Sequence, residues 1–197
     1  MKRNLKILLD AAHGTNIPGK CSPDHTHLEY KWSRMIIDKM IPLLATNGYD
    51  YVKLIPEDID PKDHLKRIDI NTTQARTLLI SFHNNAAGLG IQWMNARGFE
   101  VWTSRGQTNS DKFADILCNK LSIMFPELKG RFDITDGDKD KEEGFNVLVR
   151  KPMAVLIEWL FQDNKLDVEL LKDDKVNDRF CLAVIEAINQ FDNTYNL

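Results

Sequence analysis

The sequence predicts a single α/β domain, a sandwich in which helices flank a mostly parallel central sheet. Short apolar runs alternate along the chain with longer amphipathic segments, which is the pattern of strands and covering helices. The length of 197 residues suits one domain, and no linker divides the chain, so we expect a single domain over residues 1–197. The composition, 43% hydrophobic and 28% charged, excludes a disordered or collagen-like chain.

Five apolar runs are expected to form the strands of this sheet. Residues 77–82 (TLLISF) and 154–159 (AVLIEW) are almost continuously apolar, which is typical of buried strands. Residues 98–103 (GFEVWT) alternate between apolar and polar side chains, as a half-buried strand does. The expected strands are residues 5–10, 51–55, 77–82, 98–103 and 154–159, and residues 145–150 form a short strand or a turn.

Four amphipathic segments are expected to be the helices. In the first of them Pro42 lies inside the helical pattern, so we expect a kink or a break there. In the second, His64 and Arg67 are expected on polar faces. The expected helices are residues 28–47, 61–76, 111–125 and 174–191, and a charged loop spans residues 132–143.

The composition also limits the partners of the chain. The net charge is −3 and no stretch is strongly basic, so we expect no nucleic-acid partner. No apolar run reaches the roughly 18 residues of a membrane helix, so we expect no membrane insertion. The three cysteines are odd in number and far apart, which argues against a disulfide framework. A monomer is the default expectation.

Four polar side chains are expected to converge at one edge of the sheet. In open α/β sheets, functional residues gather at the carboxyl ends of the strands. His13 follows the first strand, His83 follows the third, and Glu158 ends the last one. Glu29, at the start of the first helix, could join them. Two histidines and a glutamate can hold one catalytic zinc ion and leave a position for water. A further carboxylate can then carry the proton.

Each of these residues also has a simpler interpretation. A glutamate in the first turn of a helix, such as Glu29, is favoured by the helix dipole without any metal. A histidine after a strand is more often a satisfied polar residue than a ligand. Glu158 is harder to explain in this way, because a carboxylate inside the run AVLIEWLF must be paired, protonated or beside a metal.

Four segments, in this order along the chain, resemble the zinc-dependent N-acetylmuramoyl-L-alanine amidases of the Amidase_3 type. The family's opening strand and its DxGHG motif resemble ILLDAAHGTNIPGK, and its first-helix glutamate matches Glu29 in HLEYKWS. The family's SxHxNA strand resembles LLISFHNNA, and its PavLvExgFxsN segment resembles PMAVLIEWLFQDN. The resemblance extends from Ile7 to about Leu171, and the set of four is far more specific than any one of them.

The resemblance implies a role for five residues. His13, Glu29 and His83 fall on the three ligands of one zinc ion, and Glu158 falls on the catalytic glutamate that acts as general base and acid. Asn85 matches the asparagine of SxHxNA, where it either binds substrate or only holds its loop.

Two departures from the family's pattern concern the backbone. Alanines 11 and 12 stand where the family has a glycine, so we expect this loop to differ. Leu160 also replaces a family glycine, which affects local packing. Two other features allow a less specific interpretation. His27 could replace one of the expected metal ligands. The acidic loop 133–143 could bind calcium, although a solvated loop is the simpler interpretation.

The implied activity is hydrolysis of the amide between N-acetylmuramic acid and L-alanine in peptidoglycan. A zinc peptidase acting on stem peptides and an inactive wall-binding module are the alternatives. The chain as printed shows no leader, and we expect one catalytic amidase domain over residues 1–197 with no separate wall-binding domain. We therefore expect a phage endolysin that stays in the cytoplasm until lysis and then acts on the wall. A host enzyme that is periplasmic or secreted after a leader, and a mother-cell lytic enzyme, are the competing settings.

Overall fold

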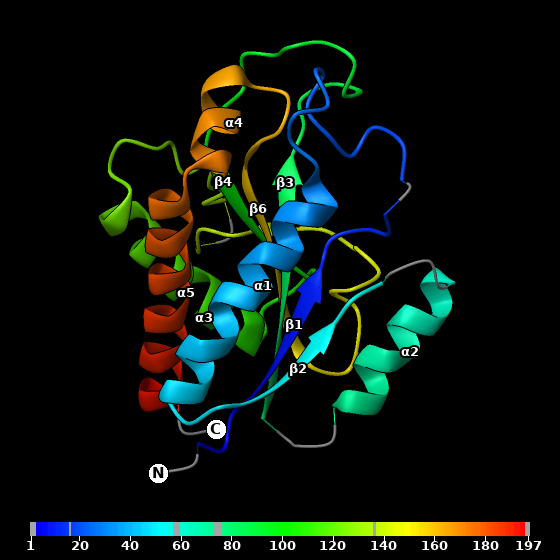
Figure 1. Ribbon diagram of the computed structural model, residues 1–197. Coiled ribbons are helices and arrows are strands. Elements are labelled where there is room, and N and C mark those ends of the chain that lie inside the picture. Colours follow the sequence, from blue (N-terminus) through cyan, green and yellow to red (C-terminus); the bar gives the residue numbers. More distant parts are fainter. Residues whose placement is uncertain (1–2, 16, 57–59, 73–75, 136, 196–197) are drawn as a thin grey trace.

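The computed structural model describes residues 3–15, 17–56, 60–72, 76–135 and 137–195, and they form an α/β domain (Figure 1). The sheet and the helices alternate along the chain, as the sequence predicts. The strands are β1 (Lys6–Ala11), β2 (Asp50–Leu54), β3 (Thr77–Asn85), β4 (Phe99–Thr103), β5 (Lys141–Glu142) and β6 (Met153–Phe161). The helices are α1 (Glu29–Thr46), α2 (Pro61–Asn71), α3 (Asn109–Met124), α4 (Lys165–Lys172) and α5 (Asp174–Thr194).

The sheet is mixed but mostly parallel, which confirms the expected fold class. Its strand order is β2-β1-β3-β6-β4-β5. Strands β2, β1, β3 and β6 run parallel to one another, whereas β4 is antiparallel to β6. The parallel strands β1, β3 and β6 lie side by side at the centre, so the residues at their carboxyl ends are neighbours.

Two apolar clusters fix the helices to the two faces of the sheet. The larger cluster joins α1, α3 and α5 to side chains such as Leu9, Phe82 and Trp159. The smaller one lies on the other face, where Ile68 of α2 packs with Leu8 of β1 and partners from neighbouring strands. Figure 1 shows α1, α3 and α5 grouped together and α2 apart from them. Apolar side chains therefore cover both faces of the sheet, and polar residues can occupy the carboxyl ends of the strands.

Several element boundaries differ from the expected ones. Helix α1 runs unbroken past Pro42, because Pro42 and Asp38 are both exposed and water can bind the carbonyl that the proline leaves free. Helix α2 ends at Asn71, earlier than expected. The short helix α4 was not expected; the Asn164 side chain caps it by accepting from the backbone N–H of Leu166 and Asp167. The charged loop contains the two-residue strand β5.

Strands β3 and β6 are longer than the sequence predicts, and their pairing is irregular near the end. His83 is the partner of Glu158, but Asn85 is the partner of Phe161, so β6 carries one extra residue in this interval. Within that interval Leu160 has a φ of 60°, a left-handed conformation that is unusual for a leucine. The position at which leucine replaces the family's glycine is therefore one where the backbone is strained. In the first loop the positive φ falls on His13, at 50°, and not on the two alanines.

Among the described residues, no helix has the length and apolar character that crossing a membrane requires.

The strain at Leu160 predicts an unusual order of stability. Its side chain is fully buried, so truncation should cost about 2–5 kcal/mol of unfolding free energy. A left-handed conformation costs an L-residue about 1–2 kcal/mol, and glycine avoids that cost. We therefore expect both Leu160→Gly and Leu160→Ala to be less stable than the wild type, with the glycine variant the more stable of the two. Urea unfolding with a chelator present measures this order, and a more stable alanine variant would contradict it.

Candidate metal centre

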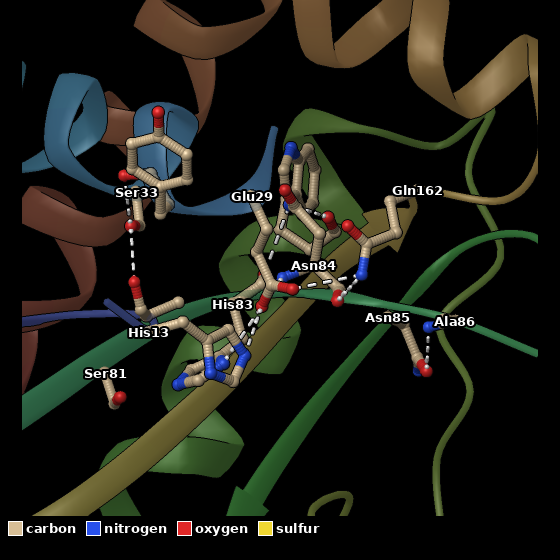
Figure 2. A network of polar contacts seen from close by, with 12 residues as sticks. His13, Glu29, Ser33, Ser81, His83, Asn84, Asn85, Ala86 and Gln162 are labelled. Atoms are coloured by element: carbon tan, nitrogen blue, oxygen red, sulfur yellow. Dashed lines mark hydrogen bonds and ion pairs between the residues drawn. The ribbon is translucent and has the colours of Figure 1, made fainter. Parts of the chain in front are cut away.

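Three side chains from distant parts of the chain meet at one point. His13 lies in the loop after β1, Glu29 is the first residue of α1, and His83 lies in β3. The Glu29 Oε1 atom lies 3.2 Å from His13 Nε2 and 3.1 Å from His83 Nδ1. Figure 2 shows the three side chains pointing toward one another. The convergence expected from the sequence is present, with Glu29 as the carboxylate at its centre.

The Glu29 carboxylate is fully buried and is held on both of its oxygens. Oε1 accepts a hydrogen bond from the Asn84 backbone N–H at 3.2 Å, in addition to its contacts with the two histidines. Oε2 accepts one from Gln162 Nε2 at 3.0 Å. Burial alone would raise the pKa of Glu29, but the nearby imidazole rings of His13 and His83 outweigh burial and hold that pKa far below its usual range. Glu29 is therefore a carboxylate anion in this site.

The same contacts act on the histidine. Burial disfavours the imidazolium of His83, but the hydrogen bond to Glu29 and its negative charge outweigh burial and raise the pKa of His83. Without a metal, a proton on this imidazole supplies part of the positive charge that the buried carboxylate needs. A divalent cation would supply the same compensation more completely.

Glu158 lies next to this group on the adjacent strand. Its backbone position on β6 pairs with His83 on β3. The side chain is partly buried, and Oε2 is inaccessible and has no hydrogen-bond partner among the described residues. Burial raises the pKa of Glu158 to about 7; the negative charge of Glu29 acts in the same direction, and His83 opposes it. A carboxyl group with a pKa near neutral can both accept and return a proton.

A cavity of about 630 Å³ opens onto these residues. His13, His83 and Glu158 line one part of it, and Lys20 contributes a cationic side chain. Much of the remaining lining is apolar and includes Ile17, Pro56, Leu65, Phe145 and Val147. A molecule with both polar and apolar parts can therefore bind there and contact the histidines and the glutamate at once.

The three converging side chains fit a divalent metal ion. Within the described part of the chain, they are the one group of three histidine, cysteine or acidic residues whose ligand atoms all lie within 4.8 Å of one another. His13 Nε2 is buried, and although it lies close to Glu29 it makes no hydrogen bond of good geometry. Two imidazole nitrogens and one carboxylate oxygen are a donor set that zinc prefers in catalytic sites.

The other residues singled out in the sequence lie away from this group. Asn85 Oδ1 accepts from the Ala86 backbone N–H at 2.8 Å, within its own loop, and Asn85 is not among the residues that line the cavity (Figure 2). A substrate contact by Asn85 stays a prediction. His27 is buried and contacts Asn84 Oδ1 through Nε2 at 2.8 Å, so its ring is engaged outside the metal group. Arg67 donates to the Ile55 carbonyl at 2.9 Å, a structural role.

The acidic loop holds a pair of neighbouring carboxylates. Asp140 is buried and accepts from Thr103 Oγ1 at 2.6 Å, and its pKa is raised to about 7, mainly by burial and then by the charge of Asp138. Asp136, which belongs to the same loop, lies outside the described residues. The calcium interpretation of this loop stays a prediction.

A second buried polar group supports the strands that lead to His13 and His83. His64, expected on a polar face, is in fact buried, and its Nε2 lies 2.6 Å from Asp10 Oδ1. The other oxygen of Asp10 accepts from Ser81 Oγ at 2.6 Å. Because Asp10 precedes His13 and Ser81 precedes His83, this group ties together the two strands that lead to the histidines. The sequence reasoning missed it, although Asp10 begins the motif that contains His13.

Gln162 was also missed. It follows directly on the apolar run of β6, and a polar side chain in such a buried position must have a partner. That signal was available in the sequence, but it does not identify the partner.

Comparison with known proteins places the chain in a family. The profile of the family described as N-acetylmuramoyl-L-alanine amidase matches residues 7–190. Among curated protein sequences, none matches the chain.

Solved structures share its fold. An N-acetylmuramoyl-L-alanine amidase from Clostridium difficile 630 superposes with a TM-score of 0.80 at 21% identity, covering 97% of this chain and 98% of that one. The CwlD amidase from Clostridioides difficile, in a complex with the GerS lipoprotein, gives 0.79 at 19% identity, covering 95% and 98%. The catalytic domain of the CD27L endolysin, which targets Clostridia difficile, gives 0.67 at 21% identity, covering 94% and 97%.

These superpositions establish the fold. The family profile, which matches most of the chain, establishes the family. The chain therefore belongs to the N-acetylmuramoyl-L-alanine amidase family, a group of peptidoglycan hydrolases.

Proposed function

We propose that the chain is a zinc-dependent amidase that cleaves the bond between N-acetylmuramic acid and L-alanine in peptidoglycan. One observation carries the proposal: two histidines converge on the buried carboxylate of Glu29, and both histidines and Glu158 line one cavity. The family match supports the reaction, and the donor set supports the metal.

In this proposal one zinc ion is held by His13 Nε2, His83 Nδ1 and Glu29 Oε1. When bound, the ion would polarise the scissile carbonyl and lower the pKa of water to about 7. The anionic state of Glu29 suits this role, because a ligand carboxylate must have lost its proton before it binds a cation.

Glu158 is the proposed general base and general acid. It lies beside His83 and faces the cavity, so it can accept a proton from the attacking water. It then donates the proton to the amine of L-alanine as the amide bond breaks. The raised pKa of Glu158, about 7, allows both steps near neutral pH. A cation in the site would lower that pKa and favour the basic form.

The remaining parts of the proposal concern the setting. The cavity, with its polar and apolar walls, suits a stem peptide joined to a sugar. We propose that the protein acts on the cell wall as a monomer. If it is phage-encoded, it reaches the wall at lysis. An endolysin catalytic domain with this fold and an amidase in complex with a lipoprotein, both cited above, are the precedents for a phage enzyme and for a partnered host enzyme.

The proposal predicts the products of digestion. Purified peptidoglycan treated with the zinc-loaded protein should release stem peptides with free L-alanine amino termini and leave the glycan strands intact. Chelation should abolish this release, and added zinc should restore it. Mass spectrometry of the soluble products measures the outcome. Cuts within the stem peptides would indicate a zinc peptidase instead, and binding to the wall without release would indicate an inactive module.

The matched control for this assay is Glu158→Gln. It should keep zinc and lose about 100- to 10,000-fold in kcat, the usual contribution of a general acid–base group. A near-normal rate would remove Glu158 from the mechanism.

The raised pKa of Glu158 also predicts a pH-dependent stability of the metal-free protein. Between its ordinary value of 4.5 and about 7, the folded state keeps a proton that the unfolded state has lost, so stability falls as the pH rises. The loss should approach about 3 kcal/mol above pH 7. Glu158→Gln cannot lose this proton, so the wild type should lose stability relative to the variant between pH 5 and pH 8. Urea unfolding with a chelator measures the difference, and a constant gap would contradict the assignment.

A further inference from the structure

We propose that Gln162 is a positioning residue for the metal ligand Glu29: its amide holds Oε2 so that Oε1 alone is presented to the ion. This inference rests on the proposed function, because it concerns the same metal site.

The contacts of Gln162 are directed at Glu29. The side chain is fully buried, and Nε2 donates to Glu29 Oε2 at 3.0 Å (Figure 2). Its backbone N–H donates to the Asn85 carbonyl at 2.8 Å, which fixes the residue against the end of β3. The amide nitrogen also lies 3.5 Å from the Asn84 carbonyl, a weaker contact. The main polar contact of this side chain is therefore with the ligand carboxylate.

The orientation of the amide follows from charge. The oxygen of the amide, Oε1, is buried and has no hydrogen-bond partner among the described residues. If the amide were reversed, this oxygen would face the Glu29 carboxylate, and two acceptors would repel each other. The nitrogen therefore faces Glu29. A buried carbonyl without a partner costs free energy, so this glutamine is poorly explained as a residue that serves only the stability of the fold.

The irregularity in β6 explains how Gln162 reaches Glu29. In a regular strand, residues 158, 160 and 162 would share one face of the sheet. The extra residue between Glu158 and Phe161 reverses this alternation, and its backbone contains the left-handed Leu160. Leu160 consequently packs in the cluster on the face of α1, and Gln162 contacts the first residue of that helix. Glu158 lines the cavity instead.

The arrangement leaves one oxygen of Glu29 for the metal. Oε2 is engaged by Gln162, whereas Oε1, which also accepts from the Asn84 backbone N–H, is the oxygen that His13 and His83 both approach. A carboxylate fixed in this way binds a cation through a single oxygen and leaves positions free for water and for the substrate carbonyl. Without the amide, the carboxylate can rotate and present both oxygens, which fills a coordination position. The hydrogen-bonding partners of a ligand commonly change metal affinity by about 10- to 100-fold.

The test compares Gln162→Met with the wild type, because methionine has a similar length and no N–H donor. Competition with a chromophoric chelator measures the zinc Kd, and we expect the variant to bind about 10-fold or more weakly. The visible absorption of the cobalt-substituted protein gives a second measurement. Its bands should weaken in the variant if the carboxylate gains a second metal contact. Gln162→Leu serves the same purpose if the methionine variant does not fold.

The control is Asn189→Leu, which removes two side-chain hydrogen bonds, with Tyr49 and Asn47, near the other end of α1. It should lower stability and leave both the zinc Kd and the cobalt spectrum unchanged. A Gln162 variant with wild-type affinity and spectrum would overturn the inference, and so would a control that changes them equally. Wild-type protein that binds neither zinc nor cobalt would instead overturn the proposed function, and this inference with it.

Discussion

A carboxylate buried at the start of a helix is the feature on which the rest of this site depends. Glu29 has no exposed surface, and its charge persists only because hydrogen-bond donors surround it. The His83 ring, the Asn84 backbone N–H and the amide of Gln162 donate to it, and the His13 ring lies close by. His83 and Asn84 both belong to β3, whereas His13 follows β1 and Gln162 follows β6. The fold must therefore be complete before the carboxylate is stabilised, and the carboxylate in turn brings those segments together.

The parallel sheet supplies the precision that this arrangement needs. Strands β1, β3 and β6 are adjacent, and the buried Asp10 joins the first two of them through Ser81 and, by way of His64, joins them to α2. His13 and His83 lie two or three residues beyond this contact along the chain. A rigid support close to a metal site limits the movement of its ligands, which a catalytic geometry requires. The left-handed backbone at Leu160 costs free energy locally, and it persists because the buried surroundings of this residue hold it in place.

The strands and most of the candidate site residues could be predicted from the sequence, whereas the contacts of His64 and Gln162 could not. The apolar runs located all the principal strands, because buried parallel strands are continuous in hydrophobicity. His13, Glu29, His83 and Glu158 could be named because their spacing resembles a known family. The buried position of His64 could not be predicted, since its partner Asp10 is distant in sequence. The role of Gln162 depends on one extra residue in β6, and hydrophobic patterns do not register such a shift.

The central claim is that His13, Glu29 and His83 together bind one zinc ion. The most direct measurement is anomalous X-ray scattering from crystals of the zinc-loaded protein, recorded on both sides of the zinc absorption edge. The account predicts a single strong peak between His13 Nε2, His83 Nδ1 and Glu29 Oε1, at about 2.0–2.2 Å from each atom. A peak at other residues, or no peak in crystals of protein that hydrolyses peptidoglycan, would contradict it.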